Sequence, residues 1–209
     1  MGVTRIWLCA GVLTCAGGVC PSVGFAQPSD GVSDDTAAEQ DVLRERTDVF
    51  APGVRHLELT AAFLSEAWDF NAGREELYGG RLAYGRGFAQ GWAHSFEAGV
   101  LRVRQERTDD VFLSTLSWIL RRRVWQRSRV TAFAEGGPGV SYATRAVPHR
   151  GTRFNWLIQG GAGANVQMGV RSYLVSGLRW FHLSNSVIRG RRRNPDIQAL
   201  GGYVGLAVF

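Results

Sequence analysis

The sequence predicts an all-β protein, an eight-stranded antiparallel transmembrane β-barrel of the outer-membrane type. Three observations support this fold: apolar and polar residues alternate with a period of two, the N-terminus has the pattern of an exported protein, and the last alternating segment ends on phenylalanine. The chain of 209 residues is long enough for one domain after the export segment is removed.

Eight segments show the alternation. In the segment 154–168, Trp156 and Ile158 share one parity, whereas Asn155 and Gln159 share the other. Each segment is long enough for the ~9–11 residues that a tilted membrane strand needs. The predicted strands are about 54–66, 75–88, 92–104, 111–121, 129–143, 154–168, 171–184 and 197–209.

Charged residues in the middle of these segments help to decide which face is outside. A soluble barrel would also alternate, with its apolar side chains inside. Here the charges mostly lie opposite the main aromatic parity, which fits an apolar outer face in lipid and a small interior filled by an acid–arginine network. Tryptophans near strand ends also favour lipid. The mid-strand charges are Glu58, Arg81, Glu97, Arg179 and Glu135, of which only Glu135 shares the aromatic parity.

Residues 1–26 have the pattern of a secretory signal peptide. Arg5 precedes a mostly apolar run, and Gly24-Phe25-Ala26 provides small residues at the −3 and −1 positions of a cleavage site. All three cysteines lie in this segment, so the mature chain is expected to contain no disulfide. No later stretch approaches the ~18 consecutive apolar residues of a membrane-spanning helix.

The charge is divided unevenly along the rest of the chain. Residues 27–52 are acidic and predict a poorly ordered periplasmic tail, whereas residues 53–209, the predicted barrel, are strongly basic. Every basic residue of the chain is arginine. A basic, exported domain rich in bidentate donors suggests an anionic, phosphate-bearing partner, and nucleic acid is not expected as a partner outside the cytoplasm.

An even number of strands places both termini in the periplasm. The connections 67–74, 105–110, 144–153 and 185–196 are then expected outside the cell. The turns near 89–91, 122–128 and 169–170 are expected on the periplasmic side.

Two side chains that could carry chemistry lie at the end of the seventh predicted strand. His182 and Ser184 share one face, and Arg179 lies on the other. If Arg179 points into the barrel, the pair points outward at the extracellular rim. Same-face neighbours on a strand are ~6–7 Å apart, and local bending would allow His182 to act as general base for a Ser184 nucleophile. A His-x-Ser pair at a barrel rim is more often an interfacial polar pair without catalytic function.

The neighbouring residues favour the catalytic interpretation. Asn185 follows the serine directly and would donate a hydrogen bond to a developing oxyanion. The next loop carries four arginines that would bind phosphate groups. These are Arg189, Arg191, Arg192 and Arg193.

The segment His182-Leu183-Ser184-Asn185, followed by Asn194-Pro195 and a short last strand, resembles the outer-membrane lipid A 3-O-deacylases of the PagL type. The motif covers about 181–209, and the architecture covers 54–209. The resemblance implies a serine-type esterase that removes the 3-O-linked acyl chain from lipid A in the outer leaflet. It assigns the roles of base to His182, nucleophile to Ser184 and oxyanion donor to Asn185.

The third catalytic residue has two candidates. Counting from the histidine, the acid of the resembled family corresponds to Asp196, whereas aligning the Asn-Pro turn gives Gln198. Strand parity counted back from Phe209 places both on the inner face. A bulge at Gly201-Gly202 would then be needed to turn either toward His182. Asp196, the only acid in this loop, is the first choice.

Other functions stay open at this stage. One is a non-catalytic OmpX-like structural barrel. Another is a relative that has lost activity because Gln198 replaced the acid, and that only binds lipopolysaccharide. No metal or organic cofactor is expected, because the other histidines are scattered singly. The expected partners are lipid A or lipopolysaccharide and the outer membrane, and a homodimer is left open.

Overall fold

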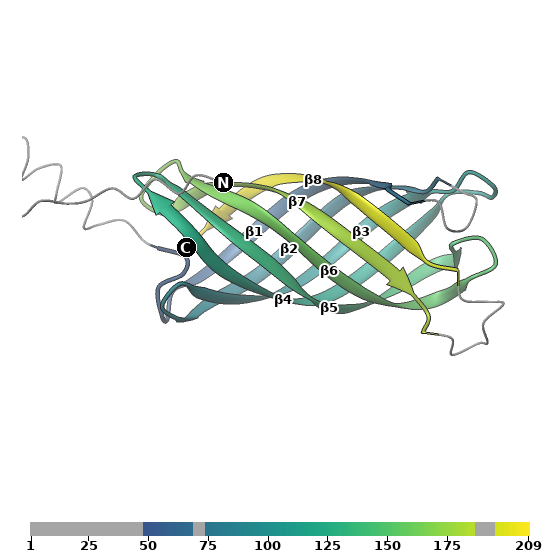
Figure 1. Ribbon diagram of the computed structural model, residues 1–209, viewed down its shortest axis with the longest axis horizontal. Helices are drawn as coiled ribbons and strands as arrows, with labels where there is room; N and C mark the ends of the chain where they lie inside the picture. The colour runs from purple at the N-terminus through teal and green to yellow at the C-terminus, as the bar shows by residue number, and fades with distance from the viewer. Residues whose placement is uncertain (1–47, 69–73, 187–194) are drawn as a thin grey trace, which may run out of the picture.

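The computed structural model describes residues 48–68, 74–186 and 195–209, and these form a closed barrel of eight antiparallel strands (Figure 1). The predicted fold class is thereby confirmed. The signal peptide and residues 27–47 of the acidic tail lie outside the described residues. The strands are β1 (Arg55–Glu66), β2 (Glu76–Ala89), β3 (Trp92–Arg104), β4 (Val111–Arg127), β5 (Val130–Val147), β6 (Thr152–Gln167), β7 (Ser172–Ser184) and β8 (Ile197–Val208).

Each strand pairs with the next, and β8 pairs with β1, so the sheet has no free edge. Both ends of the barrel chain lie at the same end of the barrel, on the left in Figure 1. The β2–β3, β4–β5 and β6–β7 turns share that end. The strand ends that the four other connections join lie at the opposite end, which we call the outer end, as the even strand number predicted.

Two strands are longer than the alternation suggested. β4 continues to Arg127 through the stretch predicted as a turn, and Arg127 pairs with Val130 across a two-residue turn. β5 continues to Val147 into the predicted outer loop. A membrane barrel can extend its hydrogen-bonded strands past the hydrocarbon layer, where no apolar face is needed. The period-two signal therefore ends before the strand does.

The outer surface of the barrel is apolar. Large hydrophobic side chains are exposed on every strand, in positions where a soluble protein would bury them. They include Leu57, Leu82, Phe96, Phe112, Tyr142, Trp156, Leu178 and Val204. This arrangement confirms the predicted apolar outer face. Separately, no helix within the described ranges is long and apolar enough to cross a membrane.

Paired charges fill the middle of the barrel. Arg179 is buried and lies 2.8 Å from Glu97 through Nη1 and 2.9 Å from Glu135 through Nε. Arg121 connects Glu135 and Glu58, at 2.8 Å and 2.5 Å. The predicted acid–arginine network is confirmed, and Arg121 is a member that the sequence analysis did not include. Buried charges need such partners, because an unpaired one carries a large desolvation cost.

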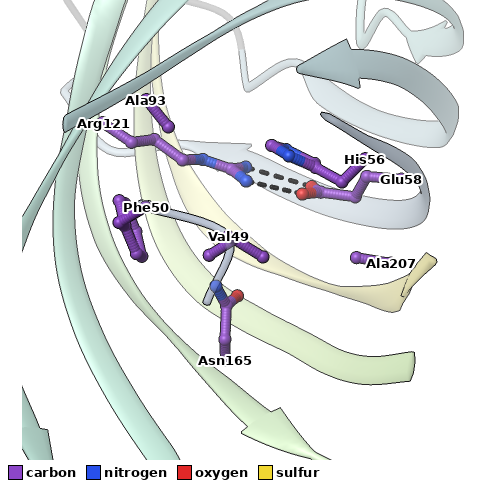
Figure 2. A pocket seen from close by; sticks show the side chains of 8 residues that line it. All are labelled: Val49, Phe50, His56, Glu58, Ala93, Arg121, Asn165 and Ala207. Atoms are coloured by element: carbon purple, nitrogen blue, oxygen red, sulfur yellow. Dashed lines mark hydrogen bonds and ion pairs between the residues drawn. The ribbon is translucent and has the colours of Figure 1, made fainter. Parts of the chain in front are cut away.

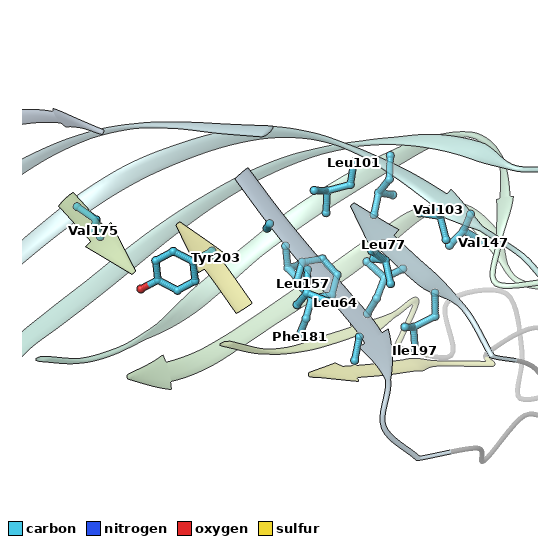
Figure 3. Packing of buried hydrophobic residues seen from close by; sticks show 14 of the residues in the cluster. Leu64, Leu77, Leu101, Val103, Val147, Leu157, Val175, Phe181, Ile197 and Tyr203 are labelled. Carbon is cyan, nitrogen blue, oxygen red and sulfur yellow. The ribbon is translucent and has the colours of Figure 1, made fainter. Parts of the chain in front are cut away.

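Apolar side chains fill the outer half of the barrel interior. Leu77, Leu101 and Leu157 are buried there, together with Phe181 and Ile197 (Figure 3). This packing lies directly inside the ends of β7 and β8. It therefore supports the strand ends that carry the candidate site.

β8 turns the opposite face inward from the one expected. Tyr203 is 5% exposed, and its hydroxyl donates to Glu135 Oε1 at 2.8 Å, whereas Val204 is 51% exposed. The Phe209 ring packs against Tyr173 inside the barrel rather than pointing into lipid. The residues on both faces of this strand are mainly apolar. The face that carries Tyr203 lies inside because the Tyr203 hydroxyl finds its buried hydrogen-bond acceptor there.

The expectation that Asp196 and Gln198 lie on the inner face is consequently wrong. Ile197 and Ala199 are the buried residues at the start of β8, so Gln198 points outward. β8 pairs with β7 and β1 without a register shift, and no bulge at Gly201-Gly202 is involved.

Residues 48–53 close the end of the barrel opposite the outer loops. Val49 and Phe50 are buried inside the barrel (Figure 2). The Phe50 ring lies 6.1 Å from that of Phe133. Only a cavity of about 10 Å³, the size of one water molecule, remains beside them. Val49 and Phe50, which belong to the tail expected from the sequence, therefore pack inside the barrel.

Candidate active site

The end of β7 presents His182 and Ser184 on the outer face. Phe181 and Leu183, which alternate with them, are buried in the apolar interior, and Arg179 is buried in the charged network. These three inward anchors fix the direction of the two side chains between them. The outward orientation predicted from strand parity is observed.

His182 and Asp196 face each other across the β7–β8 pair. His182 Nδ1 lies 3.8 Å from Asp196 Oδ2, and the two side chains are 22% and 25% exposed. This distance exceeds that of a hydrogen bond, and Nδ1 is shielded from solvent without a hydrogen-bond partner among the described residues. In a catalytic triad the acid faces Nδ1 and leaves Nε2 for the nucleophile. Catalytic hydrogen bonds are often long before substrate binds.

Gln198 contacts Asp196 rather than the imidazole. It is the register partner of His182 on β8, and its Nε2 donates to Asp196 Oδ2 at 2.9 Å. Its Oε1 accepts a hydrogen bond from Trp180 Nε1 at 3.1 Å. The structure therefore brings both candidates for the third position to this face, in different places.

Trp180 contacts the site in two ways that sequence reasoning missed. Its ring stacks on His182 with centroids 5.9 Å apart and an interplanar angle of 18°. Its indole N–H also holds Gln198. From the sequence, Trp180 is one of the tryptophans near strand ends that are expected only at the membrane interface. Its place two residues before His182, on the same strand face, is the signal that would have indicated the contact.

Ser184 lies at the end of β7, opposite Trp156 of β6. No hydrogen bond joins it to His182 within the part of the chain that the structure describes, and same-face spacing on a strand is ~6–7 Å. Asn185 follows with its side chain buried at 2% exposure. The four loop arginines, Arg189, Arg191, Arg192 and Arg193, lie outside the described residues.

The surroundings of the site are apolar and face the membrane. Ile158 is the register partner of His182 on β6 and is exposed. Trp156, Leu178 and Leu200 are exposed on the same part of the outer surface. No group of three or more side chains suited to a metal ion occurs in the described ranges. A substrate that reaches these polar side chains would lie along an apolar surface.

A model of the lipid A 3-O-deacylase (PagL) family matches residues 68–207. The chain belongs to this family. The match includes His182, Ser184, Asp196 and Gln198. No protein with a curated description matches the sequence.

Among solved structures, the chain is similar to Neisserial surface protein A (NspA). The identity is 11%, the TM-score is 0.58, and the likeness covers 74% of this chain and 96% of NspA. It is also similar to the outer membrane protein OprG from Pseudomonas aeruginosa, with 11% identity, a TM-score of 0.47, and coverage of 77% and 98%. At such identity the likeness to NspA shows the fold alone. The PagL family member is a bacterial outer-membrane β-barrel.

Proposed function

We propose that the protein is a serine-type esterase that removes the 3-O-linked acyl chain of lipid A in the outer leaflet. The observation that carries the proposal is the approach of Asp196 to His182 Nδ1 at 3.8 Å, on the same lipid-facing strand face as Ser184. Membership of the lipid A 3-O-deacylase family supplies the substrate class.

The three side chains divide the reaction as in other serine esterases. Ser184 Oγ attacks the acyl carbonyl while His182 Nε2 takes its proton. The tetrahedral intermediate then collapses, and the imidazolium returns the proton to the departing sugar oxygen, which leaves an acyl-Ser184 ester. Water, deprotonated by His182, then attacks this ester, and the imidazolium returns the proton to Ser184 Oγ as the fatty acid leaves. Asp196 stabilises the imidazolium in both halves.

Asn185 is assigned to the oxyanion. It directly follows the nucleophile, and because its side chain is buried in the structure, this role requires the amide to turn toward the acyl carbonyl when substrate binds. Its replacement should lower kcat more than it raises KM, because the oxyanion exists only in the transition state.

The exposed apolar side chains around the site suit an acylated substrate. Acyl chains would lie against Ile158, the register partner of His182 on β6, and Leu200, the register partner of Trp180 on β8. This placement brings the ester, at the polar end of the chain, to the strand end where Ser184 lies. Arg189, Arg191, Arg192 and Arg193 are assigned to the phosphate groups of lipid A on charge alone.

We assign the third catalytic role to Asp196 and a positioning role to Gln198. Trp180 fixes the Gln198 amide, and the amide in turn donates to the Asp196 carboxylate. A residue that donates to the acid cannot at the same time replace it. This division accommodates both candidates of the sequence analysis.

The proposal is tested with purified full-length protein in detergent and lipid A as substrate. Ser184→Ala, His182→Ala and the double variant should each lose fatty-acid release to a similar extent, because nucleophile and base act as one unit. Folding is checked by heat-modifiable gel migration. Folded variants that keep wild-type release would instead favour the non-catalytic, lipopolysaccharide-binding barrel.

A further inference from the structure

A polar cavity lies between two loops at the outer end, separate from the site on β7 and β8. It has a volume of about 270 Å³ and lies between the β3–β4 loop and the end of β5 with the loop that follows. This is slightly below the ~300–1,000 Å³ of pockets for drug-sized ligands. Its polar lining residues are Gln105, Thr108, Asp109, Arg145, His149 and Arg150.

One lining residue has a buried acceptor without a partner. Gln105 is 6% exposed, and its Nε2 donates to the main-chain oxygen of Asp109 at 3.3 Å. This bond assigns the amide orientation and leaves Oε1 shielded from solvent, with no hydrogen-bond partner among the described residues. A buried acceptor without a donor is unfavourable. Gln105 lines the cavity, so a rotation of its side chain on ligand binding would bring this acceptor to a ligand hydroxyl.

The cationic side chains of the lining give the cavity its charge preference. Arg145 pairs with Asp109. Arg150 is exposed and forms no ion pair within the described ranges. Its φ of 68° is a conformation that few residues other than glycine adopt, and such positions concentrate at ligand sites. Arg150 and His149 thus offer donors to an anionic group.

The cavity lies farther from the membrane than the site on β7. Trp156 is opposite Ser184, and β6 begins at Thr152, so β6 runs four residues past the level of Ser184. At the rise of a strand this is ~13 Å. The loop that carries Arg150 precedes β6. A saccharide attached to a lipid at the β7 site would project toward this level.

We propose that this cavity binds a hydroxylated, anionic saccharide group. A sugar hydroxyl donates to Gln105 Oε1, and a phosphate or carboxylate on the sugar accepts hydrogen bonds from Arg150. The saccharide belongs to the lipopolysaccharide that carries lipid A. The assignment of the saccharide to lipopolysaccharide rests on the proposed function. The preference of the cavity for a hydroxylated, anionic group does not depend on it.

The first experiment measures binding without catalysis. Full-length Ser184→Ala protein in detergent micelles is titrated with glucose 6-phosphate, glucose and inorganic phosphate, and the dissociation constants are compared by NMR. Glucose 6-phosphate should bind most tightly, and adding Arg150→Gln should weaken it about tenfold. Gln105→Leu should weaken it as well.

Arg107→Gln is the matched control, because Arg107 is an exposed arginine of the β3–β4 loop on the other side of the cavity and does not line it. It should leave binding unchanged. Unchanged binding in Arg150→Gln, or an equal loss in Arg107→Gln, would overturn the site, since the latter would indicate only diffuse charge attraction.

The second experiment identifies the source of the saccharide. KM and kcat of the otherwise wild-type protein are measured on lipopolysaccharide with a phosphorylated core and on the same lipid A without core sugars. Arg150→Gln should raise KM about tenfold on the first substrate only, with kcat unchanged. An unchanged KM on both substrates, with glucose 6-phosphate still bound, would reject the lipid-attached source. If neither substrate were deacylated, the proposed function would be overturned. The binding experiment would still show whether the cavity binds the saccharide group.

Discussion

Replacing Gln198 tests whether this residue only positions the catalytic acid, Asp196, or is itself the third catalytic residue. In Gln198→Ala, Asp196 loses the hydrogen bond that it accepts at 2.9 Å, and Trp180 loses its acceptor at 3.1 Å. The ion-pair geometry of His182 and Asp196 would still be reachable, because β7 and β8 remain paired through the interior residues on either side.

The size of the effect follows from that one charged hydrogen bond. A hydrogen bond to a charged group is worth ~1.5–3 kcal/mol when buried. The Asp196 side chain is 25% exposed, so water replaces part of the lost bond. We expect a cost of about 1.4 kcal/mol in the transition state, which is about tenfold in kcat. Asp196→Asn should cost more, ~10²–10⁴-fold, because the imidazolium loses its counter-charge.

Gln198→Glu gives the sharpest contrast. A carboxylate at this position would lie against Asp196 instead of donating to it, and two like charges in contact repel. Turnover should therefore fall below that of Gln198→Ala. If Gln198 were the third catalytic residue, the same substitution would add the missing charge and raise turnover.

The assay is fatty-acid release from one purified lipid A preparation, with kcat and KM determined for all three variants. Gln90→Ala is the matched control, since Gln90 is an exposed glutamine in the β2–β3 turn at the opposite end of the barrel. A rise in turnover for Gln198→Glu, together with wild-type turnover for Asp196→Asn, would refute the assignment.

Three further predictions concern the barrel. Arg179→Met removes one buried cationic partner from each of two acids, Glu97 and Glu135, and should cost ~3–5 kcal/mol of unfolding free energy, measured by urea unfolding in vesicles; an unchanged midpoint would contradict the network. Phe50→Ala should lower the stability of the barrel by ~3–5 kcal/mol while leaving kcat unchanged, because Phe50 packs at the end opposite the site; equal losses of both would contradict this separation. A Cβ on Gly201 would lie 2.0 Å from a backbone oxygen of β1, whereas one on Gly202 has its nearest neighbour at 3.7 Å. Gly201→Ala should therefore impair assembly and Gly202→Ala should not, as judged by heat-modifiable migration; the reverse order would contradict the register of β8.

The strand number and the outer face could be predicted from the sequence because a membrane barrel imposes two different solvents on alternate residues. His182 and Ser184 could be placed on the outer face for the same reason, since Arg179 can only be stabilised inside. The presence of paired acids and arginines inside the barrel was also predictable. The membership of Arg121 was not, because it stands next to Arg122 and Arg123 in what resembles a basic turn.

The face of β8 that points into the barrel could not be predicted. The alternate residues that include Tyr203 and those that include Val204 are both mainly apolar. Only the contact of the Tyr203 hydroxyl with Glu135, 68 residues away in sequence, selects the inner one. The positions of Asp196 and Gln198 depend on that choice. The hydrogen bond between Asp196 and Gln198 depends on Trp180, which holds the Gln198 amide in place. Contacts that join three residues across two strands in this way cannot be read from spacing in the sequence.

The central claim is that Ser184 carries out lipid A deacylation, and the mass of lipid A in the producing membrane tests it most directly. Bacteria that produce the wild-type protein, the Ser184→Ala variant or neither are compared by mass spectrometry of extracted lipid A, with equal amounts of folded barrel in the outer membrane. We expect wild-type cells to show lipid A lighter by the mass of one 3-O-linked acyl chain, and Ser184→Ala cells to match cells without the protein. Lipid A that is equally shortened in wild-type and Ser184→Ala cells would contradict the account.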